Sequence, residues 1–473
     1  RAGNRGFWDQ PDAACYIGFR IARNAEAPTR DSQDPWESEI AARKAIEARG
    51  GSFRAVDRYL QAVSMPFSRE LIAQLTHLPD VRQLSLQTDG EVEIGQSEID
   101  QLTALRDLEL LNFSGAFNLE RVNLGALREL EKLKDLQFSR SSSLTDADLE
   151  ELSGLTTLES FRCYGAGGGL TDAGISQLKN NTNLRSLIIS EADATGACLA
   201  DFKNCPLEVL GLTCFKEAQH SLTDDYAKAL ANFPNLRELL LNEQGSIAEQ
   251  TLLVCGGLKN LEIFNLQNAK SISKNGFGSL AGLQELRSLN LQGTQAGDGA
   301  TAAIAKIPRL NELRIGSSNL SDHGLQALEN SFSIENLTIT ESVATDDGLK
   351  SLGRINRLRR LEIRSPYITG SGLGPICKLP FLIDLKLPCP ALTDIAFEHL
   401  SRAKTIQKIR LVERGVQPAV ALTDNGLLKM KRATWLKELW LPRNDSGLTE
   451  SVMEELKAAG VGVIPYTVDW ERK

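Results

Sequence analysis

The pattern Leu-x-x-Leu-x-Leu recurs along most of this chain and constrains its fold more than any other feature. Fifteen copies run from Val81-Leu84-Leu86, through Leu105-Leu108-Leu110, to Leu436-Leu439-Leu441, at steps of 23 to 30 residues. Self-similarity at such a period is typical of repeat architectures, in which one unit cannot bury its apolar face alone but stacked units can. The sequence therefore predicts one elongated array rather than two or three separate domains.

A second motif, Leu-Thr-Asp, follows many of these copies and precedes apolar residues at helical spacing. In one unit Thr145-Asp146 is followed by Leu149, Leu152 and Leu155. Thr and Asp oxygens accept the first free N–H groups of a helix, and a negative charge is favourable there. Each unit is thus predicted to be a strand, a turn and a short helix. Narrow strands beside wider helices predict a curved α/β solenoid of about 15–16 repeats, with a parallel sheet on its concave face.

These units resemble the leucine-rich-repeat family, in the Leu-Thr-Asp-x-Gly-Leu subtype found in bacterial repeat proteins and F-box adaptors. The resemblance covers about residues 67 to 465. The family's usual Asn is mostly replaced, for example by Ser141, Thr294 and Pro366, so a full asparagine ladder is not expected. Nothing resembling an F-box precedes the repeats, and an adaptor role in ubiquitin ligation is not expected.

The ends of the array are expected to be covered by capping elements. Residues 35–49 have the pattern of an amphipathic helix ended by Gly50-Gly51, and Val461 and Val463 suggest a degenerate closing repeat. We therefore expect residues 25–66 to form a linker and an N-terminal capping helix, and residues 67–473 to form the solenoid with its C-terminal cap.

The first 24 residues carry a different pattern, with Pro11-Asp12 upstream of Ile17-Gly18-Phe19-Arg20. This segment resembles the last strand of the formylglycine-generating enzymes, or sulfatase-modifying factors. In that family the catalytic cysteines lie upstream of this segment, and Cys15 does not match them. The resemblance implies that residues 1–24 are a C-terminal remnant of such a domain. It leaves open the alternative that this chain is the targeting region of a longer enzyme of that type.

Composition excludes several classes of partner and ligand. The net charge is −8 and the pI is about 5.4, which argues against nucleic acid or anionic membrane as the partner. No stretch approaches the ~18 apolar residues of a membrane span. The eight cysteines form no Cys-x-x-Cys pair, so we expect buried apolar thiols and favour a reducing, cytoplasmic compartment.

The remaining candidates for chemistry have simpler structural explanations. The four histidines have no metal-ligand spacing, and the Gly-rich segment 165–169 lacks the Lys-Ser/Thr of a phosphate loop. The recurring Asp residues occur once per unit, which favours helix capping over calcium binding. We therefore expect no catalytic, cofactor-binding or metal-binding residues, and no enzyme activity of this chain.

The concave face is the best candidate for function. Alternation along each strand buries the leucines and exposes the residue between the last two, as in Ser85, Glu109 and Gln137. Arg and Trp are common interface anchors, and amides suit a peptide backbone. We expect a protein or peptide partner with an acidic or polar surface; the alternative is a scaffold without a specific ligand. The candidate residues are Tyr164, Asn265, Asn290, Arg314, Arg360, Arg364, Lys386, Lys408, Arg410 and Trp440.

Overall fold

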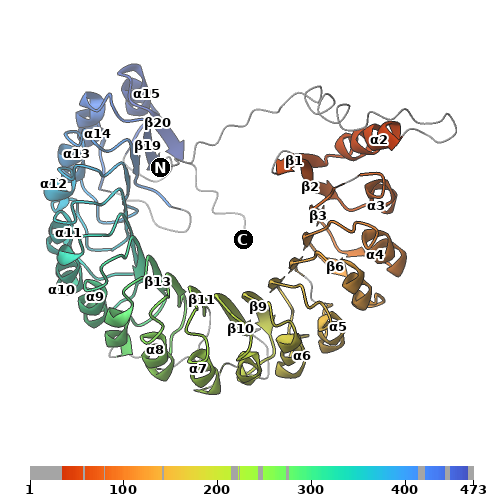
Figure 1. The fold of residues 1–473 in the computed structure, drawn as a ribbon. Helices are drawn as coiled ribbons and strands as arrows, with labels where there is room; N and C mark the ends of the chain where they lie inside the picture. Colours follow the sequence, from red (N-terminus) through yellow and green to blue (C-terminus); the bar gives the residue numbers. More distant parts are fainter. Residues whose placement is uncertain are drawn as a thin grey trace.

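The computed structural model describes residues 35–466, except 57–58, 79, 141–142, 215–221, 223, 243–248, 273–275, 414–420 and 443–447. The described chain is one curved solenoid, with strands along the inner side of an open ring and helices on its outer side (Figure 1). Eighteen strands form one continuous sheet. The predicted α/β solenoid with a parallel concave sheet is confirmed.

The helices are short, as the repeat spacing requires. The strands are β1 (Ser52–Val56), β2 (Tyr59–Pro66), β3 (Gln83–Gln87), β4 (Val92–Glu93), β5 (Leu110–Ser114), β6 (Phe117–Asn118), β7 (Asp135–Ser139), β8 (Ser160–Tyr164), β9 (Ser186–Ala192), β10 (Val209–Cys214), β11 (Glu238–Leu240), β12 (Ile263–Asn265), β13 (Ser288–Gln292), β14 (Glu312–Gly316), β15 (Asn336–Thr340), β16 (Arg360–Ile363), β17 (Asp384–Lys386), β18 (Lys408–Arg410), β19 (Glu438–Pro442) and β20 (Val463–Tyr466). The α-helices are α2 (Pro35–Ala48), α3 (Arg69–Leu75), α4 (Gln96–Leu102), α5 (Asp146–Leu152), α6 (Asp172–Gln177), α7 (Asp224–Leu230), α8 (Glu249–Cys255), α9 (Asp298–Ile304), α10 (Asp322–Ala327), α11 (Asp346–Leu352), α12 (Leu373–Ile376), α13 (Ile395–Leu400), α14 (Asp424–Leu428) and α15 (Glu450–Ala458). The 3-10 helices are η1 (Leu124–Glu129), η2 (Leu178–Asn180), η3 (Ala197–Phe202), η4 (Gly276–Gly282), η5 (Leu328–Asn330) and η6 (Lys429–Arg432).

The order of strands in the large sheet follows the order of the chain. β1 and β2 pair antiparallel, and each later pair is parallel, ending with β19 and β20. The fifteen predicted copies correspond to the strands from β3 to β19, and β2 and β20 extend the sheet at its two ends. Because β2 is hydrogen-bonded to β3, the sheet already includes residues before position 67, where we placed the start of the array.

Each repeat buries the residues that the pattern selects. In one unit Leu337 and Ile339 of β15 face the core, and Leu349 and Leu352 of α11 cover them; none is more than 1% exposed. The strands are narrower than the helices behind them, so stacking of many units bends the array into the open ring of Figure 1. None of the helices in the described part of the chain is long and apolar enough to cross a membrane.

The second predicted copy was placed in the wrong register. The sheet aligns Leu111 and Phe113 with Leu84 and Leu86, whereas Leu110 is only partly buried. The unit is therefore Leu108-Leu111-Phe113 rather than Leu105-Leu108-Leu110. The physical reason is the core: the Phe113 ring is fully buried and stacks on Phe138, with ring centroids 5.1 Å apart.

The N-terminal end of the array is covered by α2, which buries Ala42 and Ile46. The helix ends where expected, because Gly50 adopts a left-handed conformation with φ of 87°. At the other end Val461 and Val463 are buried and β20 completes the predicted closing repeat. The segment that resembles the formylglycine-generating enzymes, residues 1–24, lies outside the described residues.

The cysteines pack as expected from the sequence. Seven of them lie in the described residues; all seven are free thiols, and Cys163, Cys198, Cys205, Cys255 and Cys389 are buried. Burial raises the pKa of Cys163 and of Cys389 to about 12. These thiols are therefore protonated at neutral pH and act as small apolar core residues.

Candidate functional site: the concave face

A central row of side chains crosses the concave face, one from each strand of the large sheet from β3 to β19. The sheet register aligns these residues directly with one another, which confirms the alternation expected from the sequence. One member differs: Asn112, and not Glu109, lies between Ser85 and Gln137. The row consists of Ser85, Asn112, Gln137, Arg162, Ile188, Gly211, Leu240, Asn265, Asn290, Arg314, Thr338, Glu362, Lys386, Arg410 and Trp440.

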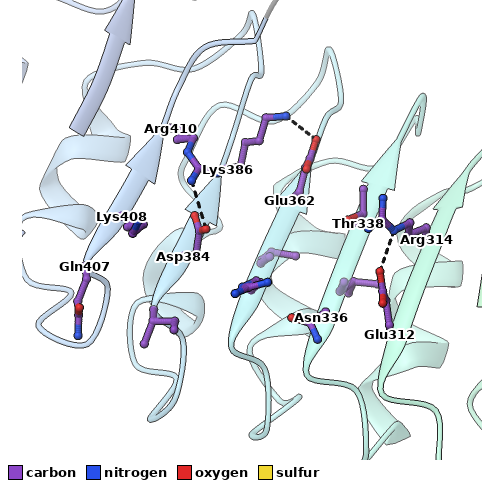
Figure 2. A pocket seen from close by; sticks show the side chains of 14 residues that line it. Glu312, Arg314, Asn336, Thr338, Glu362, Asp384, Lys386, Gln407, Lys408 and Arg410 are labelled. Atoms are coloured by element: carbon purple, nitrogen blue, oxygen red, sulfur yellow. Dashed lines mark hydrogen bonds and ion pairs between the residues drawn. The ribbon is translucent and has the colours of Figure 1, made fainter. Parts of the chain in front are cut away.

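The C-terminal part of this face contains a groove of about 650 Å³ over five consecutive strands, from β14 to β18 (Figure 2). It brings together five of the ten candidate residues, whereas Tyr164, Asn265, Asn290, Arg364 and Trp440 do not line it. The five candidates that line it are Arg314, Arg360, Lys386, Lys408 and Arg410.

Four of these five cations already have acidic partners on the same face. Arg314 pairs with Glu312 at 2.8 Å, and Arg410 approaches Asp384 at 3.5 Å (Figure 2). Lys408 pairs with Glu438 at 2.5 Å, and Lys386 is held by two glutamates. Arg360 has no ion pair among the described residues. Most of the positive charge of the groove is thus paired within the described residues, and the groove is not the continuous basic strip that the candidate cations suggested.

Lys386 is the most constrained of the paired cations. Its Nζ lies 2.9 Å from Glu362 and 3.0 Å from Glu413, and its side chain is only 20% exposed. Burial acts to lower the pKa of Lys386, but the hydrogen bonds to the two glutamates act in the opposite direction and hold it above its ordinary value. The contact with Glu413 was not predicted from the sequence, because Glu413 lies after β18, in the repeat next to that of Lys386.

In the amide-rich middle of the face, some side-chain amides form hydrogen bonds with neighbouring residues of the face. Asn265 and Asn290 each accept the backbone N–H two residues further on, from Gln267 and Gln292. The Asn290 amide also donates to the Gln267 side chain at 3.2 Å. These contacts restrain the side chains of both asparagines.

A second line of side chains, here called the edge row, borders the face at the amino ends of the strands. Each member donates its backbone N–H to the carbonyl of the member before it, as Glu109 does to Arg82. The charges alternate in sign, and neighbours form ion pairs such as Arg82–Glu109 at 3.6 Å and Lys134–Glu159 at 3.5 Å. This row was not predicted from the sequence, although in the register of the sheet its members are the residues that follow the first apolar position of each copy. Its members are Arg82, Glu109, Lys134, Glu159, Arg185, Glu208, Arg237, Glu262 and Arg287.

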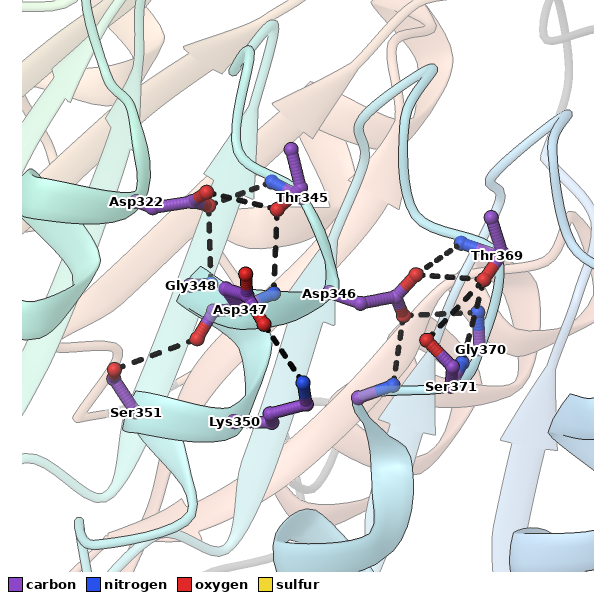
Figure 3. Close-up of polar contacts among 11 residues, drawn as sticks. Asp322, Thr345, Asp346, Asp347, Gly348, Lys350, Ser351, Thr369, Gly370 and Ser371 are labelled. Carbon is purple, nitrogen blue, oxygen red and sulfur yellow. Dashed lines mark hydrogen bonds and ion pairs between the residues drawn. The ribbon is translucent and has the colours of Figure 1, made fainter.

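The recurring aspartates join neighbouring repeats. Asp346 accepts hydrogen bonds from the hydroxyl of Thr369 at 2.6 Å and from the backbone N–H of Gly372 at 2.8 Å, both in the next repeat (Figure 3). Burial acts to raise the pKa of Asp346, but these hydrogen bonds outweigh it and hold the pKa below its ordinary value. The expected capping role is thus confirmed in a modified form, because the carboxylate serves the following helix and the Thr hydroxyl serves its own. In the described part of the chain, no three His, Cys, Asp or Glu side chains are grouped to hold a metal ion.

The Gly-rich segment 165–169 follows β8 and uses its donors within the sheet. The N–H of Ala166 binds the carbonyl of Ser190, and that of Gly168 binds the carbonyl of Glu191. Gly165, Gly167 and Gly168 all have positive φ, which the turn requires. The glycines therefore serve the turn between β8 and α6.

Comparison with known proteins supports the fold. No protein-family model and no curated protein sequence matches this chain. A leucine-rich-repeat protein of Leptospira interrogans is similar in structure, with a TM-score of 0.53 at 15% identity over 85% of this chain and 93% of its own. An internalin of Listeria monocytogenes (TM-score 0.34, 18% identity, 98% of this chain and 96% of its own) and a plant peptide hormone receptor (TM-score 0.44, 13% identity, 85% and 76%) are further neighbours. The Leptospira comparison shows that this chain has the leucine-rich-repeat fold.

Proposed function

We propose that this chain is a protein-interaction module whose concave face docks a protein or peptide partner. The observation that carries the proposal is the groove over β14 to β18, where charged side chains from four of the five strands line one open floor. A parallel sheet with one face packed on helices and the other left open offers a continuous surface of this kind. Arg360, the one cation of the groove without an ion pair in the described part of the chain, favours a partner that presents at least one acidic group.

The proposal is tested by site-specific photo-crosslinking in cells of the source. A photoreactive phenylalanine analogue replaces Thr338 on the groove floor, and the matched control replaces Gln326, which is exposed on α10 of the outer side. We expect a defined protein adduct from position 338 and none from position 326. The same adducts from both positions, or adducts from 326 alone, would contradict docking on the concave face and leave the scaffold alternative.

The segment 1–24 supports a second proposal, that the solenoid is the targeting region of a longer enzyme of the formylglycine-generating type. The supporting observation is the Ile17-Gly18-Phe19-Arg20 motif with its upstream Pro11-Asp12. The intact mass of the native polypeptide, with peptide mapping of its N-terminal region, tests this. Upstream peptides with a cysteine pair would support the enzyme proposal, and a native mass near 51.7 kDa would contradict it.

A further inference from the structure

Exposed large apolar side chains gather in three consecutive repeats. Of nine such side chains in the described residues, six lie between positions 332 and 395, and the other three are Tyr164, Leu253 and Ile263. The segment 332–395 contains β15, β16 and β17, the three central strands of the groove floor. Clusters of exposed apolar residues on otherwise polar surfaces mark interaction sites. The six are Phe332, Val343, Tyr367, Phe381, Ile383 and Ile395.

Five of these six side chains form two rims at opposite ends of the strands, whereas Ile395 begins α13. Phe332 precedes β15, and Phe381 and Ile383 precede β17, whereas Val343 follows β15 and Tyr367 follows β16. Because the strands are parallel, the first three lie along the amino-end edge and the other two along the carboxyl-end edge. The aromatic members are well exposed, at 83% for Phe332, 55% for Tyr367 and 53% for Phe381. A charged floor thus lies between two apolar rims.

The edge row changes its character in these repeats. The alternation of charges ends after Arg287, and Ile383 occupies the place next to Arg359 where an acidic partner would continue the row. Arg359 pairs with Glu335 on its other side at 3.1 Å, and its guanidinium carbon also lies 5.9 Å from the centroid of the Phe381 ring. Ile383 is 39% exposed and lines the groove. It takes no part in the charge pairing of this edge, and its exposed apolar side chain is suited to contacting a partner.

Arg360 provides the charge at the centre of this surface. It begins β16 between Asn336 and Asp384 and lines the groove. The other four cations of the floor are held in ion pairs, and Arg360 has none with the residues that the structure describes, so a ligand carboxylate can engage it without displacing a partner among them. Arg and aromatic side chains in one surface are the usual anchors of protein interfaces.

We infer that the repeats of β15 to β17 bind an extended protein segment that carries a carboxylate between two apolar side chains. The carboxylate binds Arg360, and the apolar side chains contact the rims of Phe381 and Tyr367. β16 alone spans about 13 Å, and Tyr367 and Phe381 lie beyond the ends of the strands, so the two apolar side chains are at least about four residues apart in an extended segment. This inference rests on the proposed function and specifies its site and ligand chemistry.

A random 12-residue peptide library displayed on phage, selected against the full chain, tests this. We expect enriched peptides with an Asp or Glu between two apolar residues. The affinity of a fluorescein-labelled enriched peptide should fall about 10-fold or more for Arg360→Gln, and similarly for Phe381→Ser and Tyr367→Ser. Arg162→Gln, on the same face at β8, is the matched control and should leave affinity unchanged. A peptide with Lys in place of the acid should bind Arg360→Glu better than it binds the native chain.

The outcomes distinguish the inferred peptide site from the proposed docking function of the concave face. A library without binders, or binders whose affinity is equal on the native chain and on Arg360→Gln, overturns the inference. Binders that respond to Arg162→Gln and not to Arg360→Gln place the site elsewhere on the concave face, so the inference fails while the proposed function stands. Dimerisation of the chain that is abolished by Phe381→Ser would identify a second copy as the occupant and overturn the peptide inference. Photo-crosslinks from position 326 alone would remove the proposed function itself.

Discussion

Asp322 of α10 accepts two hydrogen bonds from Thr345 of the next repeat, at 2.7 Å from the backbone N–H and at 2.8 Å from the hydroxyl (Figure 3). The same carboxylate accepts the N–H of Gly348 at 3.0 Å. Each such aspartate sets the position of the following helix, so it joins two repeats rather than stabilising its own. Equivalent pairs are Asp146–Thr171, Asp172–Thr195, Asp298–Ser321, Asp346–Thr369, Asp394–Thr423 and Asp424–Thr449.

Asp322→Ala is expected to destabilise the array by about 1–3 kcal/mol, because it leaves the donors of Thr345 and Gly348 without their acceptor. Urea unfolding followed by circular dichroism measures the change. Asp347→Ala is the matched control: that carboxylate is 78% exposed, and its contact with Lys350 is worth at most about 0.5 kcal/mol. Equal losses in the two variants would contradict the inter-repeat role.

Gly348→Ala tests the same junction from the other side. A Cβ at Gly348 would lie 2.5 Å from the Asp322 carboxylate oxygen, so the two repeats would have to separate. We expect a loss of about 1–3 kcal/mol in unfolding free energy. Gly278→Ala, where a Cβ meets nothing within 4 Å, should be neutral or stabilising by up to about 1 kcal/mol. A neutral Gly348→Ala would show that the close approach imposes no requirement for glycine.

The pKa of Asp346 lies below its ordinary value of about 3.9 in the folded chain. A lowered folded-state pKa stabilises the fold above the unfolded pKa, and this contribution is lost as the pH falls through the folded value. The stability difference between the native chain and Asp346→Asn should therefore be largest at pH 6 and shrink as the pH falls below about 4. Urea unfolding at a series of pH values measures it, and a difference that is independent of pH would contradict the hydrogen-bonded carboxylate.

Phe113→Ala and Leu110→Ala distinguish the two possible registers of the second repeat. Phe113 is fully buried against Phe138, so its truncation should cost about 3–5 kcal/mol. Leu110 is partly exposed on β5, and its truncation should cost about 1 kcal/mol or less. Urea unfolding of both variants is the measurement. The reverse order of losses would restore the register Leu105-Leu108-Leu110.

Much of the fold could be predicted from the sequence, because the apolar positions of the repeat determine which residues of each strand and helix face the core. The strand period of two determines that Lys386 and Arg410 face outward while Leu385 and Ile409 face the core, and the sheet register agrees. The stretch from Leu105 to Phe113 was ambiguous because two overlapping matches fit the pattern, three residues apart. Only the packing of Phe113 in the core decides between them.

The candidate site was less predictable, because ion pairing depends on residues from different repeats. Alternation placed Lys386 on the open face, but its two partners come from β16 and from the segment after β18. The apolar rims belong to turns, whose residues have no fixed orientation in the repeat pattern. Side-chain geometry was needed to separate Arg360 from the other cations of the groove, which are paired.

The edge row gives the N-terminal half of the solenoid a structural unit of two repeats. Its charge sign reverses at every step from Arg82 to Arg287, so removal or insertion of one repeat would bring two like charges together. Removal or insertion of two repeats would preserve every ion pair. We therefore expect a gene duplication that copies one repeat in this half to meet a small electrostatic penalty that a copy of two repeats avoids.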